Sequence, residues 1–228
     1  MRLKLSCLLV SLVGCGTLHG ARPLHPGQHE VGLVAGGPMI QLGGPLPLPN
    51  AVLGARSGLG HIAGRPLDLG YGTNLTGLPF GIVSLYGDLG WLALDQKGAA
   101  PAFTVRNKLF WSHNLLASKR DDVPKEPWAA DELDLIVSWK LREHVFHGTI
   151  GQVFDFTGPQ LNLVAGIGAA LDFGRPGGLV LEPEVRWWAL NHVSRERNVQ
   201  FIPANPGAIG IHLGFAYRFG RGMGKGAR

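Results

Sequence analysis

The sequence has little charge and no long apolar run. Charged residues make up 16% of its 228 residues, whereas an ordinary soluble domain carries roughly 25%. The apolar content of 45% is ordinary. A membrane-spanning helix needs about 20 consecutive, mostly apolar residues, and no segment beyond the N-terminal region offers such a run. This excludes a helical membrane protein, while low charge with ordinary apolarity is typical of a β-barrel whose outer wall faces lipid.

Cysteine is nearly absent too, and both copies, Cys7 and Cys15, lie close to the N-terminus. The first 15 residues have a positive start, a short apolar stretch and small residues at its end, which is the pattern of an export signal. Leu12-Val13-Gly14-Cys15 resembles the bacterial lipobox, in which the cysteine becomes the acylated first residue after cleavage. The resemblance implies a signal peptide over residues 1–14 and lipidation of Cys15. A plain signal peptide cut near Gly20-Ala21 is the alternative.

Use of the lipobox has two further consequences. Cys7 leaves with the signal and Cys15 carries lipid, so no disulfide is expected despite an oxidising compartment. Gly16 follows the cysteine where lipoproteins retained in the inner membrane often carry Asp, which favours transfer to the outer membrane. We therefore expect residues 15–27 to be a periplasmic linker.

From residue 28 onward, apolar residues recur at every second position, which predicts strands rather than helices. The last strand is the clearest case. One face carries apolar side chains at Ile209, Ile211, Leu213, Phe215, Tyr217 and Phe219. The other face carries Gly210, His212, Gly214, Ala216 and Arg218. Such segments run for about ten residues, the length of a tilted strand that crosses a bilayer.

Strand length and loop length together predict the architecture. We expect strands over 28–37, 50–60, 66–77, 81–94, 101–111, 132–142, 144–154, 161–173, 178–190 and 207–219. Short and long connections tend to alternate between them, as they do in outer-membrane barrels. The predicted fold is therefore all-β: a single antiparallel transmembrane β-barrel of about ten strands over residues 28–219. Eight strands remain an alternative, because 50–60 and 144–154 are the weakest segments.

The end of the chain carries a second resemblance. His212, Gly214, Tyr217 and Phe219 are similar to the signal that the barrel-assembly machinery reads on final strands. Residues 220–228 form a basic, glycine-rich tail after it. An even number of strands places both termini in the periplasm of a Gram-negative bacterium, with the barrel in its outer membrane.

A barrel of eight to ten strands has an interior that side chains can fill. The side chains predicted to point inward carry both signs: Asp68, Asp88, Arg106, Lys108, Asp134, Lys140, Asp172, Glu182, Glu184, Arg186 and Arg218. Buried charges persist when they are paired. We therefore expect a salt-bridged lumen; a selective path for an ion or solute is the alternative.

Only one constellation in the sequence suggests catalysis. His192-Val193-Ser194 follows a strand, and Asn205-Pro206-Gly207 precedes the last one. This resembles the C-terminal part of the outer-membrane lipid A deacylases, and the resemblance implies Ser194 as nucleophile and His192 as general base. The sequence departs from that family in having Arg195 after the serine and Ile209 where the family's acid would fall. Glu182, Glu184 or Glu196 would have to orient the histidine instead.

The remaining expectations concern partners and ligands. The net charge is +5, but Lys and Arg alternate with Asp and Glu, which argues against a nucleic-acid surface. The histidines at 113, 144 and 147 lack carboxylate or cysteine neighbours at ligand spacing, so we expect no metal and no cofactor. The expected partners are outer-membrane lipid, lipopolysaccharide and the machineries that process lipoproteins and assemble barrels. The sequence thus favours a non-enzymatic envelope role in structure, adhesion or selective passage, with lipid A hydrolysis as the alternative.

Overall fold

The computed structural model describes residues 20–41, 45–47, 49–116, 127–158, 160–173, 178–191 and 206–220. Ten long strands make up nearly all of this part of the chain. In order they are β1 (Gln28–Gln41), β3 (Asn50–Ile62), β4 (Arg65–Asn74), β5 (Ile82–Leu94), β6 (Ala102–Asn114), β7 (Trp128–Leu141), β8 (His144–Asp155), β9 (Gln160–Phe173), β10 (Leu179–Trp188) and β11 (Ala208–Gly220). Two short elements lie in connections: strand β2 (Pro45–Pro47) and the 3-10 helix η1 (Leu78–Phe80).

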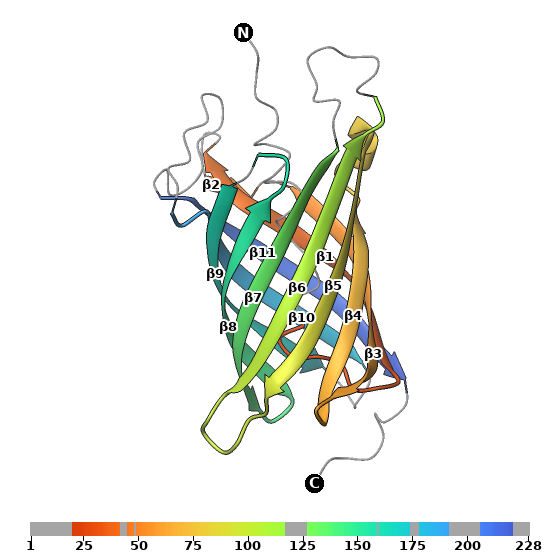
Figure 1. The fold of residues 1–228 in the computed structure, drawn as a ribbon, viewed down its shortest axis with the longest axis vertical. Coiled ribbons are helices and arrows are strands. Elements are labelled where there is room, and N and C mark those ends of the chain that lie inside the picture. Colours follow the sequence, from red (N-terminus) through yellow and green to blue (C-terminus); the bar gives the residue numbers. More distant parts are fainter. Residues whose placement is uncertain are drawn as a thin grey trace.

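The long strands form a closed barrel. Each pairs antiparallel with the next along the chain, and β1 closes the sheet by pairing with β11 from Gln28↔Gly220 to Pro38↔Gly210. The result is a tall cylinder of tilted strands (Figure 1). Strand β2 pairs only with the end of β1 and lies outside the cylinder's ladder. The prediction of a ten-stranded antiparallel barrel is confirmed, and the eight-stranded alternative is wrong because both weak segments are full strands.

The two ends of the barrel differ. We call the end where β1 begins and β11 finishes the turn end; it also holds the connections 63–64, 95–101, 142–143 and 174–178. At the first of these, Ala63 and Gly64 have φ of 51° and 74°, and positive φ at both central residues is what a two-residue type I′ turn requires. The opposite end, the loop end, holds the longer connections 42–49, 75–81, 115–127 and 189–207.

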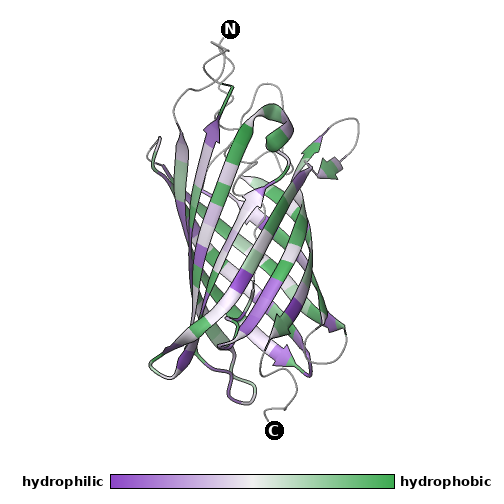
Figure 2. Cartoon of the chain, turned by 90° about the vertical axis from the view of Figure 1, so that its right-hand side faces the viewer, coloured by the Kyte–Doolittle hydropathy of each residue, from purple (hydrophilic) through white to green (hydrophobic). Residues whose placement is uncertain are grey.

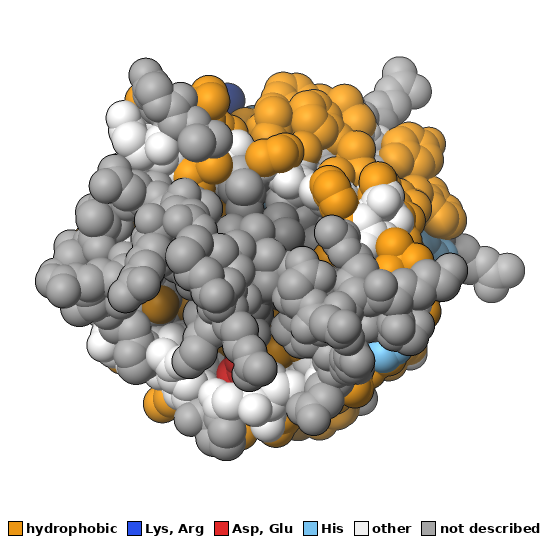
Figure 3. All heavy atoms as spheres, turned by 90° about the horizontal axis from the view of Figure 1, so that it is seen from above, with side chains coloured by type: hydrophobic (Ala, Val, Ile, Leu, Met, Phe, Trp, Pro, Cys, Tyr) orange, Lys and Arg blue, Asp and Glu red, His pale blue; other side chains and the backbone are white. Residues whose placement is uncertain are grey.

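The polarity of the barrel is the reverse of that of a soluble protein. Large apolar side chains along the outer wall are exposed, and Ile150 and Ile167 expose 70% and 68% of their surface. The others on the wall include Val31, Leu33, Leu53, Leu69, Leu85, Leu89, Leu109, Leu133, Leu135, Leu163, Val185, Ile211, Leu213 and Phe215. Apolar and polar bands alternate along each strand (Figure 2), and hydrophobic side chains lie around the outside when the barrel is viewed along its axis (Figure 3).

Aromatic side chains mark both ends of this apolar wall. Exposed rings toward the loop end belong to Phe80, Trp111 and Phe154. Exposed rings toward the turn end belong to Trp139, Phe146, Phe173, Tyr217 and Phe219. Aromatic girdles at the two interfaces of an apolar band are typical of barrels that cross a bilayer. No helix among the described residues is long and apolar enough to span a membrane.

Residues of β7 alternate between the outer wall and the lumen. Leu135 and Trp139 are exposed on the outer wall, and Asp134 is buried in the lumen. Lys140 lies on the same side of β7 as Asp134 by the alternation of the strand, but it is exposed rather than buried. It lies one residue from the end of β7 at the turn end, where an inward-pointing side chain reaches solvent.

Candidate functional site

The lumen holds a network of buried charges, and one half of it centres on Arg106. This guanidinium on β6 pairs with Asp88 on β5 and donates to Asp68 on β4 at 3.0 Å. Arg56 on β3 lies 3.7 Å from Asp68 and 3.2 Å from Glu30 on β1. All five side chains are completely enclosed. The chain of contacts therefore links five consecutive strands of the barrel from the inside.

The network continues toward the turn end. Arg218 on β11 donates to Glu30 at 2.7 Å and lies 3.7 Å from Asp172 on β9. Both Arg218 and Asp172 are half-buried, because they lie near the mouth of the barrel. Glu30 thus connects Arg218 to Arg56 across the seam between the first and the last strand.

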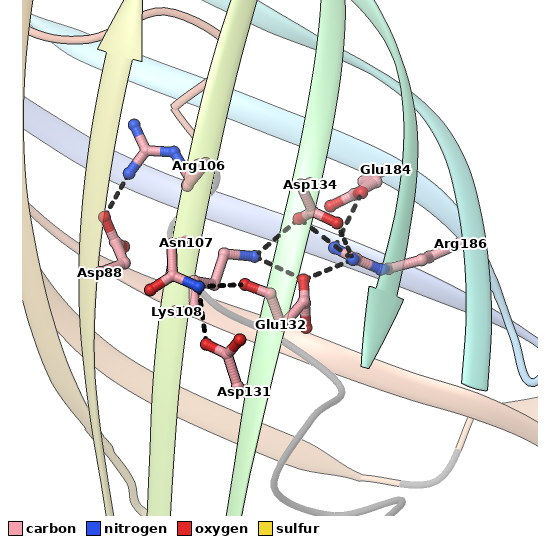
Figure 4. A network of polar contacts seen from close by, with 9 residues as sticks. All are labelled: Asp88, Arg106, Asn107, Lys108, Asp131, Glu132, Asp134, Glu184 and Arg186. Atoms are coloured by element: carbon pink, nitrogen blue, oxygen red, sulfur yellow. Dashed lines mark hydrogen bonds and ion pairs between the residues drawn. The ribbon is translucent and has the colours of Figure 1, made fainter. Parts of the chain in front are cut away.

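The other half of the network joins β6, β7 and β10. Lys108 donates to Glu132 at 2.8 Å and to Asp134 at 3.2 Å. Arg186 donates to the same two carboxylates at 2.5 and 3.2 Å, and its contact with Glu184 is longer, at 3.8 Å. Figure 4 shows Arg186 reaching from its own strand toward the acidic pair on β7. A separate polar contact lies on the outer wall, where Asn107 on β6 donates to Asp131 on β7 at 2.6 Å. The residues paired with these two across the strands are Leu133 and Leu109.

The register of the strands explains why these charges meet. Asp88 and Lys108 face each other across β5 and β6, and Lys108 faces Glu132 across β6 and β7. Side chains directly opposite one another in a sheet are neighbours, so opposite signs at paired positions attract. A buried charge without its partner costs several kcal/mol, about 3–5 kcal/mol for loss of one member of a pair. The predicted salt-bridged interior is therefore present, and it also includes Glu30 and Arg56, which the sequence analysis missed.

Inward-facing glycines leave the space that these long side chains occupy. A Cβ placed on Gly90 would collide with Arg106 and Asp68, and one on Gly151 would collide with Asp134. Gly70 gives room to Asp88 in the same way. Alternation of small and large side chains is how the interior of a small barrel is filled. The abundance of glycine, 35 residues, thus has a structural reason in the lumen.

Toward the loop end the lumen is apolar and aromatic. A buried cluster contains Val52, Tyr86, Phe110, Ala130, Val153 and Val164, with Trp128 and Trp188 packed against it. Two buried hydrogen-bonded pairs lie beside it: Asn74 donates to Asn50 at 2.8 Å, and Ser84 donates to Ser112 at 2.9 Å. Both the charged and the apolar parts of the interior are therefore filled by side chains.

A segment that precedes the first strand enters the lumen at the turn end. The backbone N–H of Leu24 donates to Asp68 at 3.1 Å, and Thr104 donates to the carbonyl of Ala21 at 3.2 Å. Arg22 donates to Ser138 at 3.0 Å. Asp68, Thr104 and Ser138 are inward-facing residues of three different strands, so residues 20–24 lie inside the barrel. The sequence predicted a periplasmic linker here, whereas the burial of Ala21 and Leu24 favours a position inside the lumen.

The residues of the catalytic hypothesis are only partly covered by the structure. His192, Ser194, Arg195, Glu196 and Asn205 lie outside the described residues. Glu182 and Glu184 are described, and both are buried in the lumen. An enzyme acting on a membrane lipid would need its acid near the lipid-facing side, and these two carboxylates point away from it.

The lipidation site and the predicted assembly signal are also only partly covered by the described residues. Cys15 lies outside the described residues. In the predicted assembly signal, His212 and Gly214 face the lumen, while Tyr217 and Phe219 are exposed on the wall with their rings stacked 6.2 Å apart. Among the described residues, no group of three His, Cys, Asp or Glu side chains could hold a metal ion.

A closed sheet with an apolar outer wall, aromatic girdles and a paired, charged interior defines a transmembrane β-barrel of the outer-membrane type. The chain is similar to the translocator domain of autotransporter NalP from Neisseria meningitidis, with 15% identity, 95% of this chain and 94% of that chain covered, and a TM-score of 0.43. It is also similar to Ail, the attachment invasion locus protein of Yersinia pestis, with 10% identity, 85% and 99% covered, and a TM-score of 0.25. No family model and no curated protein matches.

Proposed function

We propose that this protein is a closed barrel of the Gram-negative outer membrane with a non-enzymatic envelope role, and that it is not a general diffusion pore. The observation that carries the proposal is the filled lumen. Ion pairs inside the lumen join strands β7 and β10, which are not neighbours in the sheet, and residues 20–24 occupy the turn end. The protein then serves the envelope through its barrel and the connections at its loop end.

The contacts that fill the lumen determine the free energy needed to open a path for a solute. A solute of sugar size would have to separate Arg186 from Glu132 and Asp134 and displace Leu24 from Asp68. Each broken buried pair exposes charges that no other group compensates. Small barrels in general have interiors just wide enough for side chains. The closed state is therefore the expected resting state.

The test is conductance and solute uptake after reconstitution. The full-length protein in planar bilayers should give no sustained open-channel current, and liposomes that contain it should not swell in isotonic sugar. The matched variant is Arg22→Ala with Leu24→Asp, which removes the Arg22 contacts, places a carboxylate beside Asp68 and should increase open events. Steady conductance of the unaltered protein, at the level of a general porin, contradicts the proposal.

The lipoprotein assignment is part of the proposal. Its support is the Leu12-Val13-Gly14-Cys15 pattern. Strand β1 begins and strand β11 ends at the turn end, which we place in the periplasm. Replacement of Cys15 by Ser should abolish labelling by a fatty-acid analogue while the barrel still inserts; unchanged labelling contradicts the assignment.

Lipid A hydrolysis is the second candidate, and its support is the resemblance of His192-Val193-Ser194 to the deacylase motif. Of the three acids that could orient the histidine, Glu182 and Glu184 are enclosed in the lumen. Glu196 would therefore have to serve. The geometry of the described residues favours the non-enzymatic role.

A further inference from the structure

On one wall of the lumen, buried carboxylates and imidazoles without hydrogen-bond partners lie next to one another. This wall is formed by β8 to β11, where strand pairing places His147, Gly168, Glu184 and His212 side by side in one row. Glu182 is the next inward-facing residue on β10, directly opposite Gly214. This row of four titratable side chains, His147, Glu182, Glu184 and His212, is called the acidic wall below.

The acidic wall is deeply buried yet its atoms lack hydrogen bonds. Each of its four side chains belongs to a residue that exposes 8% of its surface or less. Both carboxylate oxygens of Glu182, Oε1 of Glu184, Nδ1 of His147 and both ring nitrogens of His212 have no hydrogen-bond partner. Buried polar groups are almost always satisfied, and each exception calls for water, an ion or a ligand. Within the acidic wall, Glu182 and His212 are the clearest cases, because neither makes a hydrogen bond through its side chain.

The charges of the lumen indicate the sign of the missing partner. Among the described residues, the buried charged side chains comprise four cations and seven anions. Arg186 is shared between Glu132, Asp134 and Glu184, and Glu184 has the longest of these contacts, at 3.8 Å. Arg56 and Arg218 act on Glu182 from a distance, but both are also in contact with Glu30. Glu182 and Glu184 are therefore the carboxylates with the weakest pairing. A buried carboxylate needs a positive partner with hydrogen-bond donors.

Glycines make room for the side chains of the acidic wall. A Cβ on Gly168 would lie 2.7 Å from Nε2 of His147, and one on Gly166 would lie 3.0 Å from Oε1 of Glu184. Gly214 lies opposite Glu182 and gives it room in the same way. Trp188 packs edge-on against His212 at 5.2 Å between ring centroids, which closes the wall on the side of the loop end.

The spacing of the groups excludes a chelated metal and selects another kind of cation. No three of the described His, Asp and Glu side chains converge closely enough to hold a metal ion directly. The acceptors of Glu182 and Glu184 are two residues apart on one strand, with further acceptors on β8 and β11. We propose that the acidic wall binds a cation that presents several N–H or O–H donors, either an organic diamine or a fully hydrated divalent ion. This goes beyond the proposed function, because a barrel closed to diffusion can bind such a cation.

The test measures binding to the full-length protein folded in detergent micelles. Isothermal titration uses putrescine, Mg²⁺ and tetramethylammonium, the last of which has charge but no donor. Saturable binding of putrescine, Mg²⁺ or both is expected. Binding of putrescine identifies a diamine with N–H donors as the ligand, and binding of Mg²⁺ identifies a hydrated ion whose water molecules donate. Glu182→Gln with Glu184→Gln should weaken that binding by at least about 20-fold. The matched control Glu143→Gln, in the exposed turn 142–143, should bind like the unaltered protein.

A second measurement covers the case in which the double variant folds poorly. Glu182→Gln alone removes an uncompensated buried charge, so its melting temperature in cation-free buffer should be higher than that of the unaltered protein. The cation that binds should raise the melting temperature of the unaltered protein and have a smaller effect on Glu182→Gln. Absence of saturable binding, equal binding by the double variant, or an equal response to tetramethylammonium overturns the inference. These outcomes leave the conductance test of the closed barrel unaffected.

Discussion

Arg186 on β10 donates to Glu132 on β7 at 2.5 Å, although β8 and β9 lie between these strands in the sheet. The contact therefore crosses the lumen instead of following the wall. Lys108 on β6 donates to the same carboxylate at 2.8 Å. Glu132 thus accepts hydrogen bonds from a cation on the neighbouring strand β6 and from a cation on β10, two strands further along the sheet than its neighbour β8. These two contacts help to fill the interior.

Loss of that cross-lumen contact should destabilise the barrel. Arg186→Ala leaves Glu132 and Asp134 in contact with Lys108 but without their second cation, and it should lower the free energy of unfolding by about 3–5 kcal/mol. Urea unfolding in detergent or lipid measures it. Lys140→Ala, which removes an exposed cation at the turn end, is the control and should change stability by less than about 0.5 kcal/mol. Equal effects of the two variants would argue against the network.

The outer wall can be tested with arginine at two depths of the same strand. Leu135→Arg places a charge in the middle of the exposed face of β7 and should cost about 2–4 kcal/mol, because lipid cannot solvate it. Leu141→Arg is at the end of β7 and should cost about 0–1 kcal/mol. Refolding into lipid vesicles at graded urea concentrations compares them. The reverse order would mean that the wall does not face lipid.

The inward-facing glycines should be intolerant of even one methyl group. In Gly151→Ala, the new Cβ meets Asp134 and the carbonyl of Leu133, so a loss of about 1–3 kcal/mol in unfolding free energy is expected. Gly60→Ala is the control, since no atom lies within 4 Å of its Cβ and stability should hardly change. If both variants unfold at the same urea concentration, close packing in the lumen is not limiting.

The position of the segment before β1 should be visible by thiol labelling. In a background with Cys7 and Cys15 replaced by Ser, Leu24→Cys should react slowly with a polar maleimide, because Leu24 exposes 3% of its surface. Leu46→Cys, at a residue that exposes 53%, should react at once. Rapid labelling of both would place residues 20–24 outside the lumen in solution.

The hydrolase alternative has a direct test in lipid A. Cells that produce the unaltered protein and cells that produce Ser194→Ala should have lipid A of the same mass. An imidazole without an orienting acid loses about four orders of magnitude of activity in Ser-His-Asp enzymes. Loss of an acyl chain that depends on both Ser194 and His192 would reverse the order of the two proposed functions.

The sequence by itself determined the number, length and alternation of the strands. All ten predicted segments coincide with observed strands to within a few residues, including 50–60 and 144–154. Two-residue periodicity is a local property, and in a barrel it survives folding because each strand has one face toward lipid and one toward the lumen. Inward charges such as Asp68, Arg106 and Arg186 could be identified on the same basis.

Only the tertiary structure decided which of these charges meet. Arg186 and Glu132 are 54 residues apart, and their contact depends on closure of the sheet and on the register of four strands, neither of which the periodicity contains. The same holds for Glu30 with Arg218, which meet only because β1 pairs with β11. The exposure of Lys140 could not be predicted, because alternation gives the side of a strand on which a residue lies and not its depth in the barrel. The entry of residues 20–24 into the lumen had no periodic signal, since it results from space and hydrogen-bond acceptors that exist only once the barrel has closed.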